Sequence, residues 1–243
     1  MKKFILASLL YLFLSTLFAQ TGEDYKKFIE NAEGYSNLYR GTAPLAYKFT
    51  HTGTYFAYSP DFQIGTVRYN SKIYTNLMLN LNSHLDELYL FISYSGRYVV
   101  LNNDFVESFT MGTKEFHNIT LQKGDNTPGL SPGYYEVLYK NDSAKLYKKI
   151  KKTYAERINQ SASSETNSKL ERMFLATNTY HLVKGEKVYG VKRVGDIIRI
   201  YPAKRKEIRH LIREKNLDAR SNRDNSFAEI IKFVESTSPN TIK

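Results

Sequence analysis

A two-residue alternation of side-chain character constrains this chain more than any other feature of its sequence. The alternation is clearest over residues 73–81, where Leu77, Leu79 and Leu81 are separated by Met78 and Asn80. A period of two is that of a β-strand with one buried face. The same period recurs from residue 38 to residue 201, so we expect this stretch to fold as β-structure.

Turn-forming sequences separate the predicted strands, as at Asn70-Ser71, Ser95-Gly96 and Asn141-Asp142. The strands that we predict are 66–69, 73–81, 87–94, 98–101, 105–110, 134–140, 144–149, 179–184 and 187–192. Hairpins that follow one another along the chain build an antiparallel sheet, which closes as a sandwich or as a partly open barrel. The fold class is therefore α+β and mainly β.

Helical spacing appears only near the two ends of the chain. Residues 23–33 carry Tyr25, Phe28 and Ile29 at helical spacing, which predicts a short N-terminal helix. Pro202 is well placed to begin a helix, and a second helix is predicted after a cap at Ser221 or Asn222. We expect these two helices to form a helical hairpin over 202–243.

The first nineteen residues have the three-part pattern of a secretory signal peptide. Lys2 and Lys3 precede an apolar run, and cleavage is predicted after Ala19. The run is too short to cross a bilayer, so we expect no transmembrane segment in the mature chain. The expected organisation is a signal peptide at 1–19, an antiparallel β domain at 20–201 with a mobile loop at 159–168, and a basic helical hairpin at 202–243. The expected location is the periplasm, the outer-membrane surface or the extracellular space.

Charge is distributed unevenly between the halves of the chain. Residues 20–139 contain 9 basic and 12 acidic side chains, whereas residues 140–243 contain 24 basic and 12 acidic ones. Such asymmetry indicates an anionic partner. Export argues against nucleic acid, which leaves an acidic envelope protein or an anionic glycolipid or polysaccharide. The best candidates for the contact are Lys204, Arg205, Arg209 and Arg213 in the first predicted C-terminal helix.

A second run of basic residues lies in the predicted strand that begins at residue 144. Its members are Lys145, Lys148, Lys149, Lys151 and Lys152. Lysines on a strand are a common protection of an exposed sheet edge against aggregation. We therefore predict that this strand lies at the edge of the sheet.

No catalytic or metal-binding signature supports an enzyme. Residues 129–133 match the G-x-S-x-G pattern around Ser131, but a serine nucleophile needs a strand before it and a helix after it. The cluster from His84 to Glu87 lacks metal-ligand spacing and is expected to be a solvated turn. The chain has no Cys, which excludes disulfides and thiol chemistry. We expect no cofactor and no metal, and keep an envelope hydrolase acting on a glycan or ester as the alternative.

Longer patterns point in the same direction as the signal peptide. They include G-T-Y-F-x-x-S-P-D-F-x-x-G-T-V within residues 53–67, G-Y-Y-E-V-L-Y-K at 133–140 and K-R-K-E-I-R-H-L-I-R-E-K-N-L at 204–217. With them, the chain resembles a group of uncharacterised exported β-rich proteins of Bacteroidetes. The resemblance implies export and β architecture, and it implies no site residue.

Overall fold

A computed structural model of the chain describes residues 37–120, 129–160 and 168–236. It divides into two compact units, residues 1–40 and 41–243. The described residues of the first unit include the short 3-10 turn η2 (Asn37–Tyr39). The predicted signal peptide and the predicted helix at 23–33 lie outside the described residues.

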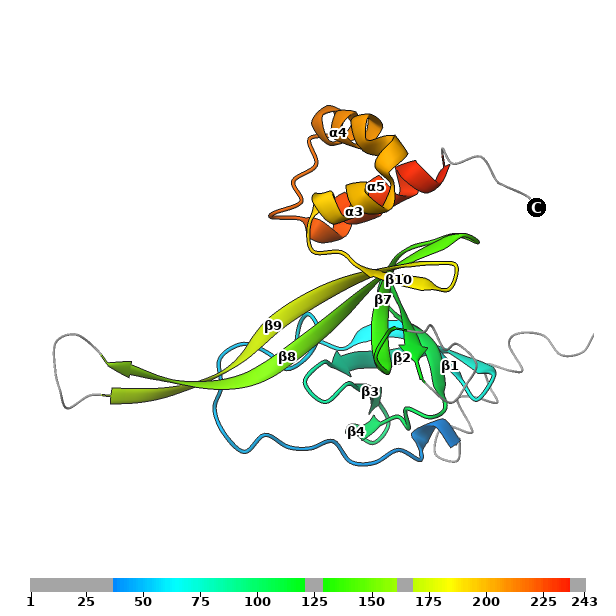
Figure 1. Ribbon diagram of the computed structural model, residues 1–243. Helices are drawn as coiled ribbons and strands as arrows, with labels where there is room; N and C mark the ends of the chain where they lie inside the picture. Colours follow the sequence, from blue (N-terminus) through cyan, green and yellow to red (C-terminus); the bar gives the residue numbers. More distant parts are fainter. Residues whose placement is uncertain (1–36, 121–128, 161–167, 237–243) are drawn as a thin grey trace, which may run out of the picture. The chain divides into compact units, whose positions relative to one another are not determined.

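The second unit is built on one antiparallel sheet of ten strands, which is not closed (Figure 1). The strands follow the order β10-β9-β8-β7-β6-β5-β1-β2-β3-β4. Their bounds are β1 (Gln63–Tyr69), β2 (Lys72–Asn82), β3 (Glu87–Ile92), β4 (Arg97–Val100), β5 (Val106–Met111), β6 (Lys114–Ile119), β7 (Gly133–Lys140), β8 (Ala144–Gln160), β9 (Ser168–Lys184) and β10 (Lys187–Gly190). The predicted sheet of sequential hairpins is confirmed, and it is one open sheet rather than two packed sheets.

The β1–β2 hairpin shows how local sequence sets the strand pairing. Asn70 and Ser71 both have positive φ angles, 48° and 65°, as the tight turn of a two-residue hairpin requires. Tyr69 then pairs with Lys72 across the turn. The sequence therefore specifies this register through the turn.

Two features of the sheet differ from the sequence prediction. Strand β6 was not predicted, although its Phe116 stacks on Phe109 of β5 with ring centroids 4.7 Å apart. Strands β8 and β9 have 17 residues each, far more than the predicted 144–149 and 179–184. Most of the extra length has no buried face, so it lacks the clear apolar alternation on which the prediction depended. The predicted loop at 159–168 lies partly in these strands and, over 161–167, outside the described residues.

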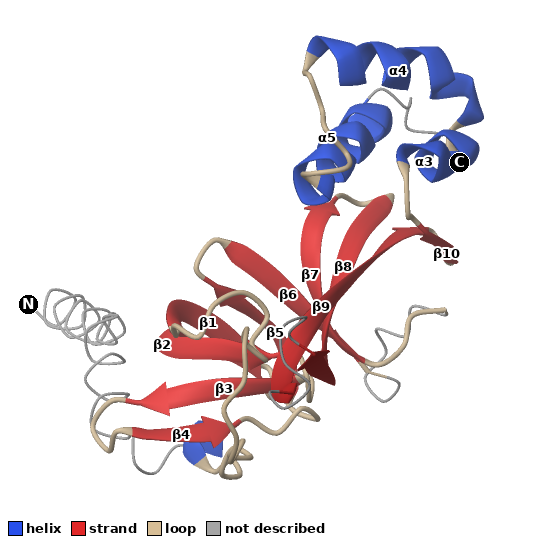
Figure 2. Cartoon of the chain, turned by 90° about the vertical axis from the view of Figure 1, so that its left-hand side faces the viewer, coloured by secondary structure: helices blue, strands red, loops and turns tan. Residues whose placement is uncertain are grey.

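Three helices and one short 3-10 turn follow the last strand (Figure 2). They are α3 (Val194–Ile200), η3 (Pro202–Lys204), α4 (Arg205–Glu214) and α5 (Arg223–Ser236). Helix formation begins eight residues before the predicted start at Pro202. Asp196 explains this early start, because its carboxylate accepts hydrogen bonds from the backbone N–H groups of Lys192 and Arg193 at 2.9 and 3.0 Å.

The helices and the sheet bury a common core. Ile208 of α4 and Phe227 and Ile230 of α5 are fully buried in one cluster with Leu146 of β8 and Leu182 of β9. Burying a side chain of this size stabilises the fold by roughly 1.5–3 kcal/mol. The position of the helices is therefore fixed by apolar packing on the sheet.

The turn between β2 and β3 lies against β8 and is not the solvated turn predicted from the sequence. The carbonyl of Ser83 accepts a hydrogen bond from the backbone N–H of Lys152 at 3.0 Å. His84 Nδ1 lies 3.0 Å from the carbonyl of Lys152. Asp86 forms an ion pair with Lys149 at 2.6 Å. These contacts connect two parts of the sheet that are far apart in strand order.

Strand β8 lies between β7 and β9 in the strand order, so the prediction of an edge strand is wrong for its first part, up to Lys148. Lys149, Lys151 and Lys152 follow the last residue that pairs with β7, and there β8 pairs with β9 on one side. Lys148 and Lys152 are buried, with 3% and 8% of their surface exposed. Carboxylates on β7 and α5 pair with Lys148, and the carboxylate of Asp86 pairs with Lys149. Long-range ion pairs thus neutralise Lys148 and Lys149, and the local sequence does not reveal them. Burial lowers the pKa of Lys152, which has no carboxylate partner in an ion pair among the described residues.

Candidate binding surface on the C-terminal helices

A buried ion-pair network attaches the start of α5 to the sheet. Lys148 Nζ lies 2.5 Å from Asp224 Oδ2 and 3.3 Å from Glu136 Oε2. Tyr58 donates a hydrogen bond to Glu136, and Tyr180 donates one to Asp224 at 2.7 Å. Burial and the nearby Glu136 carboxylate raise the pKa of Tyr58 far above its usual value, so this phenol stays protonated and remains a donor.

A second buried carboxylate attaches the other end of α5. Glu235 accepts hydrogen bonds from Ser143, from Tyr201 at 2.5 Å and from Lys184 at 3.0 Å. Its burial alone would raise its pKa, but these three donors outweigh that effect and the pKa is lowered. Helix α5 is thus held at both ends by side chains from the β7–β8 turn, β8, β9 and the loop after α3.

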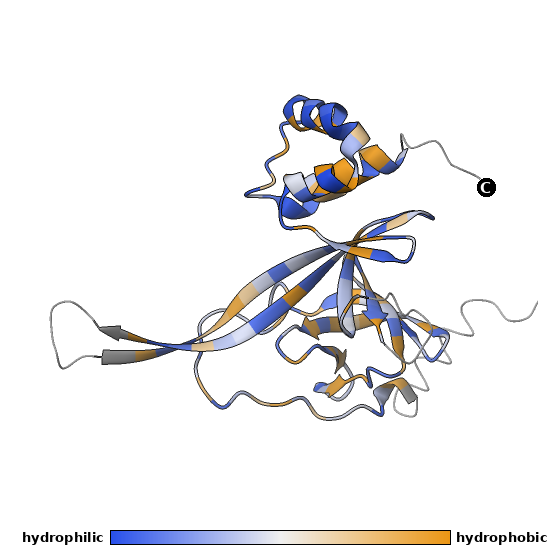
Figure 3. Ribbon diagram, in the orientation of Figure 1, coloured by the Kyte–Doolittle hydropathy of each residue, from blue (hydrophilic) through white to orange (hydrophobic). Residues whose placement is uncertain are grey.

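Helix α4 packs on the anchored α5 through one apolar side. Ile208 and Leu211 are 0% and 5% exposed and belong to the core cluster that includes Ile230 and Val234 of α5. Figure 3 shows α4 as largely hydrophilic and α5 as rich in hydrophobic residues. The rest of α4 is therefore directed to solvent.

The structure brings three of the four predicted contact residues together. Arg205, Arg209 and Arg213 are spaced four residues apart on α4, which places them along one side of the helix, and all three are exposed. Within the described part of the chain, none of their guanidinium groups forms an ion pair with a carboxylate. Lys204 differs, because its ammonium group pairs with Glu207 at 2.9 Å.

Lys206 belongs to the same side of α4 and was not among the predicted residues. At 100° per residue, Lys206 projects within about 60° of Arg209 and about 20° of Arg213. It is exposed and, among the described residues, has no carboxylate partner in an ion pair. A helical projection of the sequence would have identified it. We call Arg205, Lys206, Arg209 and Arg213 the basic flank of α4.

An open groove of about 890 Å³ adjoins the basic flank. Leu211 and Ile212 of α4 and Phe233 of α5 supply its apolar lining. Lys206, Arg209 and Arg213 border it, and two carboxylates of the opposite flank, Glu207 and Glu214, also reach it. The surface thus combines fixed positive charge with a recessed apolar strip.

The positive charge predicted from the C-terminal half is only partly available to a partner. Ion pairs within the protein neutralise Lys148, Lys149 and Lys184, which all lie on β8 or β9. Lys215 at the end of α4 pairs with Glu229 of α5 at 2.5 Å. The basic flank gathers four cations without a carboxylate partner among the described residues on one helix, whereas other such cations, among them Lys145, Lys151 and Lys187, lie on the strands.

Ser131 does not have the surroundings of a hydrolytic nucleophile. Its Oγ lies 3.0 Å from the hydroxyl of Tyr135, and β7 rather than a helix follows it. His117 lies on β6, where its ring nitrogens face Glu115 and Tyr147 at 2.9 and 3.1 Å. His181 faces Thr179. Across the described ranges, no carboxylate or histidine is hydrogen-bonded to Ser131, so this residue gives the hydrolase alternative no geometric support.

Among the residues that the structure describes, no three His, Asp or Glu side chains are grouped as metal ligands. No described helix has both the length and the apolar character that crossing a membrane requires.

Comparison of the chain with protein-family models, with curated proteins and with solved structures found no match.

Proposed function

We propose that this chain is an exported, non-enzymatic protein of the cell envelope that binds an acidic protein or an anionic glycolipid or polysaccharide through the basic flank of α4. One observation carries the proposal. Arg205, Arg209 and Arg213 lie exposed along one side of a helix, without carboxylate partners among the described residues. The export part rests on the signal-peptide pattern of residues 1–19 and on the resemblance to exported proteins.

The chemistry of arginine supports a role in recognition. A guanidinium group presents five donors in a planar fork that suits carboxylates and phosphates. Helix α4 packs on α5, and both ends of α5 are attached to the sheet, so the backbone positions of the three arginines are set before an anionic surface approaches. Only their side chains lose conformational freedom on binding. Their field also increases the rate of encounter with an anionic partner, and salt reduces this effect.

A charge-reversal variant tests the proposal. The tagged mature protein is incubated with its native cell envelope and washed at low and high salt, and bound protein and lipid are identified by mass spectrometry. We expect a defined anionic partner that is lost at high salt. We expect the triple variant Arg205→Glu, Arg209→Glu and Arg213→Glu to lose it at low salt as well.

The matched control changes the same amount of charge elsewhere. Arg68, Lys72 and Arg97 are exposed on β1, β2 and β4, and the variant Arg68→Glu, Lys72→Glu and Arg97→Glu should retain the partner. Equal loss in both variants would mean that net charge, and not α4, determines binding. Retention of the partner by the α4 variant would refute the proposal.

A further inference from the structure

The outer part of the β8–β9 hairpin is a two-stranded ribbon that extends away from the other strands (Figure 1). Strand β7 pairs with β8 no farther than Lys148, whereas β8 and β9 remain paired as far as Gln160 and Ser168. From Thr153 to Gln160 the ribbon is about 25 Å long at the usual rise per strand residue. We call this ribbon the arm. A two-stranded ribbon is only marginally stable in water by itself.

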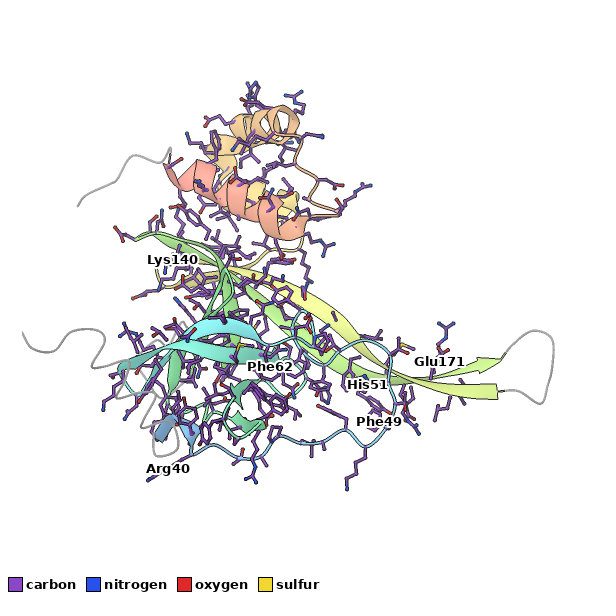
Figure 4. The ribbon with its side chains drawn as sticks, turned by 180° about the vertical axis from the view of Figure 1, so that it is seen from behind. Arg40, Phe49, His51, Phe62, Lys140 and Glu171 are labelled. Atoms are coloured by element: carbon purple, nitrogen blue, oxygen red, sulfur yellow. The ribbon has the colours of Figure 1, made fainter. Side chains whose placement is uncertain are left out.

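Residues 49–52, which we call the strap, pair with the edge of β9 and place Phe49 against one face of the arm at its base. Thr52 pairs with the β9 backbone, accepting a hydrogen bond from the Phe174 N–H at 3.1 Å and donating one to the Arg172 carbonyl at 2.8 Å. The ring of Phe49 lies 5.1 Å from that of Tyr154 between centroids. Figure 4 shows Phe49 and His51 beside the base of the arm, with Glu171 farther out.

The same face continues beyond the strap without a cover among the described residues. Tyr154, Glu156 and Ile158 alternate along β8 and therefore point to one face. Ile158 is directly opposite Leu170 of β9 in the strand register. These two side chains are 64% and 43% exposed, so an apolar cross-strand pair lies in solvent.

The next cross-strand pair on this face has no net charge. Glu156 and Arg172 form an ion pair at 3.2 Å between Oε1 and Nε on the face that carries Ile158 and Leu170. The whole chain carries a formal net charge of +11, so the net charges of two copies repel each other. On this face of the arm, opposite charges lie side by side, and a second copy of the same row meets no net repulsion.

We propose that the arm is a self-association surface, on which Ile158 and Leu170 of one copy pack against the same residues of a second copy. A two-fold arrangement in which one patch meets itself is the usual form of a homodimer. The strap limits the contact to the outer part of the arm. The buried area is therefore far below the roughly 1,200 Å² of a standard interface, and the dimer is weak and depends on concentration.

Sedimentation velocity of the mature protein over a concentration series tests this inference at low and at high salt. We expect the weight-average sedimentation coefficient to rise from the monomer value toward the dimer value at micromolar to millimolar concentration. High salt should preserve or strengthen the association, because the contact is apolar and the repulsion between the copies is screened. The variant Ile158→Asp with Leu170→Asp should remain monomeric at every concentration.

Leu175 provides the matched control. It is 51% exposed and pairs with Thr153, which places it on the opposite face of the arm. Leu175→Asp should associate like the wild type, and thermal unfolding of all three proteins checks that the fold is intact. Three results would overturn the inference: a wild type that stays monomeric throughout, an Ile158 and Leu170 variant that still associates, or equal loss in the Leu175 variant. None of these depends on the basic flank of α4.

Discussion

The ammonium group of Lys148 in the middle of β8 lies 2.5 Å from the carboxylate of Asp224 in the first turn of α5. The two residues are 76 positions apart in the chain. Lys148 also faces Glu136 on β7, and its side chain is 3% exposed. This contact connects the sheet to the helix on which α4 packs, so together with the apolar core it helps to position the basic flank.

Removal of the Lys148 ammonium group should destabilise the protein strongly. In Lys148→Met, the buried Glu136 loses one of its two ammonium partners and keeps Lys114 at 2.9 Å, and Asp224, whose side chain is 35% exposed, loses its ammonium partner. Removal of one partner of a buried polar contact costs about 1–3 kcal/mol, and more for charged groups. Urea unfolding should show this as a lower midpoint with an unchanged slope.

Lys145→Met is the control for that measurement, because Lys145 lies on the same strand and is exposed. Its free energy of unfolding should stay within about 0.5 kcal/mol of the wild type. Equal stability of the Lys148 variant and the wild type would show that the network contributes nothing to the attachment of α5.

Glu235 should make stability depend on pH in the acid range. Its pKa in the folded protein is lowered from the usual 4.5, because the donors Ser143, Tyr201 and Lys184 outweigh the effect of its burial. A carboxyl group with a lowered folded pKa stabilises the protein fully above its unfolded pKa and loses this contribution as pH falls through the folded pKa. The free energy of unfolding should therefore fall below about pH 4.5.

Glu235→Gln isolates this effect. The variant should be less stable than the wild type by about 2 kcal/mol at pH 7, since a charge-assisted network becomes a neutral one. The difference between the two proteins should shrink as pH falls from 5 to 3. Glu186→Gln, in the exposed β9–β10 turn, is the control and should follow the wild-type curve. A constant difference across this range would contradict the assignment.

Gly133 combines a positive φ angle with close side-chain neighbours, so a single methyl group there should be disruptive. Its φ angle is 123°, and a Cβ there would lie 1.8 Å from Asp86 Oδ2 and 2.3 Å from Lys149 Nζ. Gly133→Ala must therefore displace an ion pair and strain the backbone, which should cost about 3 kcal/mol or more.

Gly96→Ala serves as the comparison, because Gly96 also has a positive φ of 65° but has no atom within 4 Å of the added Cβ. It should cost about 1 kcal/mol, the backbone contribution alone. Thermal or urea unfolding measures both variants. If the two variants were equally destabilised, the crowding at Asp86 and Lys149 would have no energetic consequence.

Features of the fold that depend on residues close together in the sequence were predictable. Residues 77, 79 and 81 are buried leucines of β2, as the alternation indicated, and the turn at Asn70-Ser71 is a tight hairpin. Strand β1 lies between β2 and β5, and nothing in the local sequence indicates that β5 returns to that position. The sequence pattern did not predict the arm at the outer ends of β8 and β9, because the arm has no continuous buried face.

The candidate binding surface on α4 was likewise predictable only in part. The residues alone predict that the C-terminal half carries an excess of positive charge and that Arg205, Arg209 and Arg213 share one side of a helix. Which cations remain available to a partner depends on contacts between segments that are far apart in the chain. Lys148 is neutralised in the interior by Asp224 and Glu136, whereas Arg209 stays exposed. The physical reason is that an ion pair depends on distance in space, and its two partners are brought together only when the sheet and α5 pack against each other.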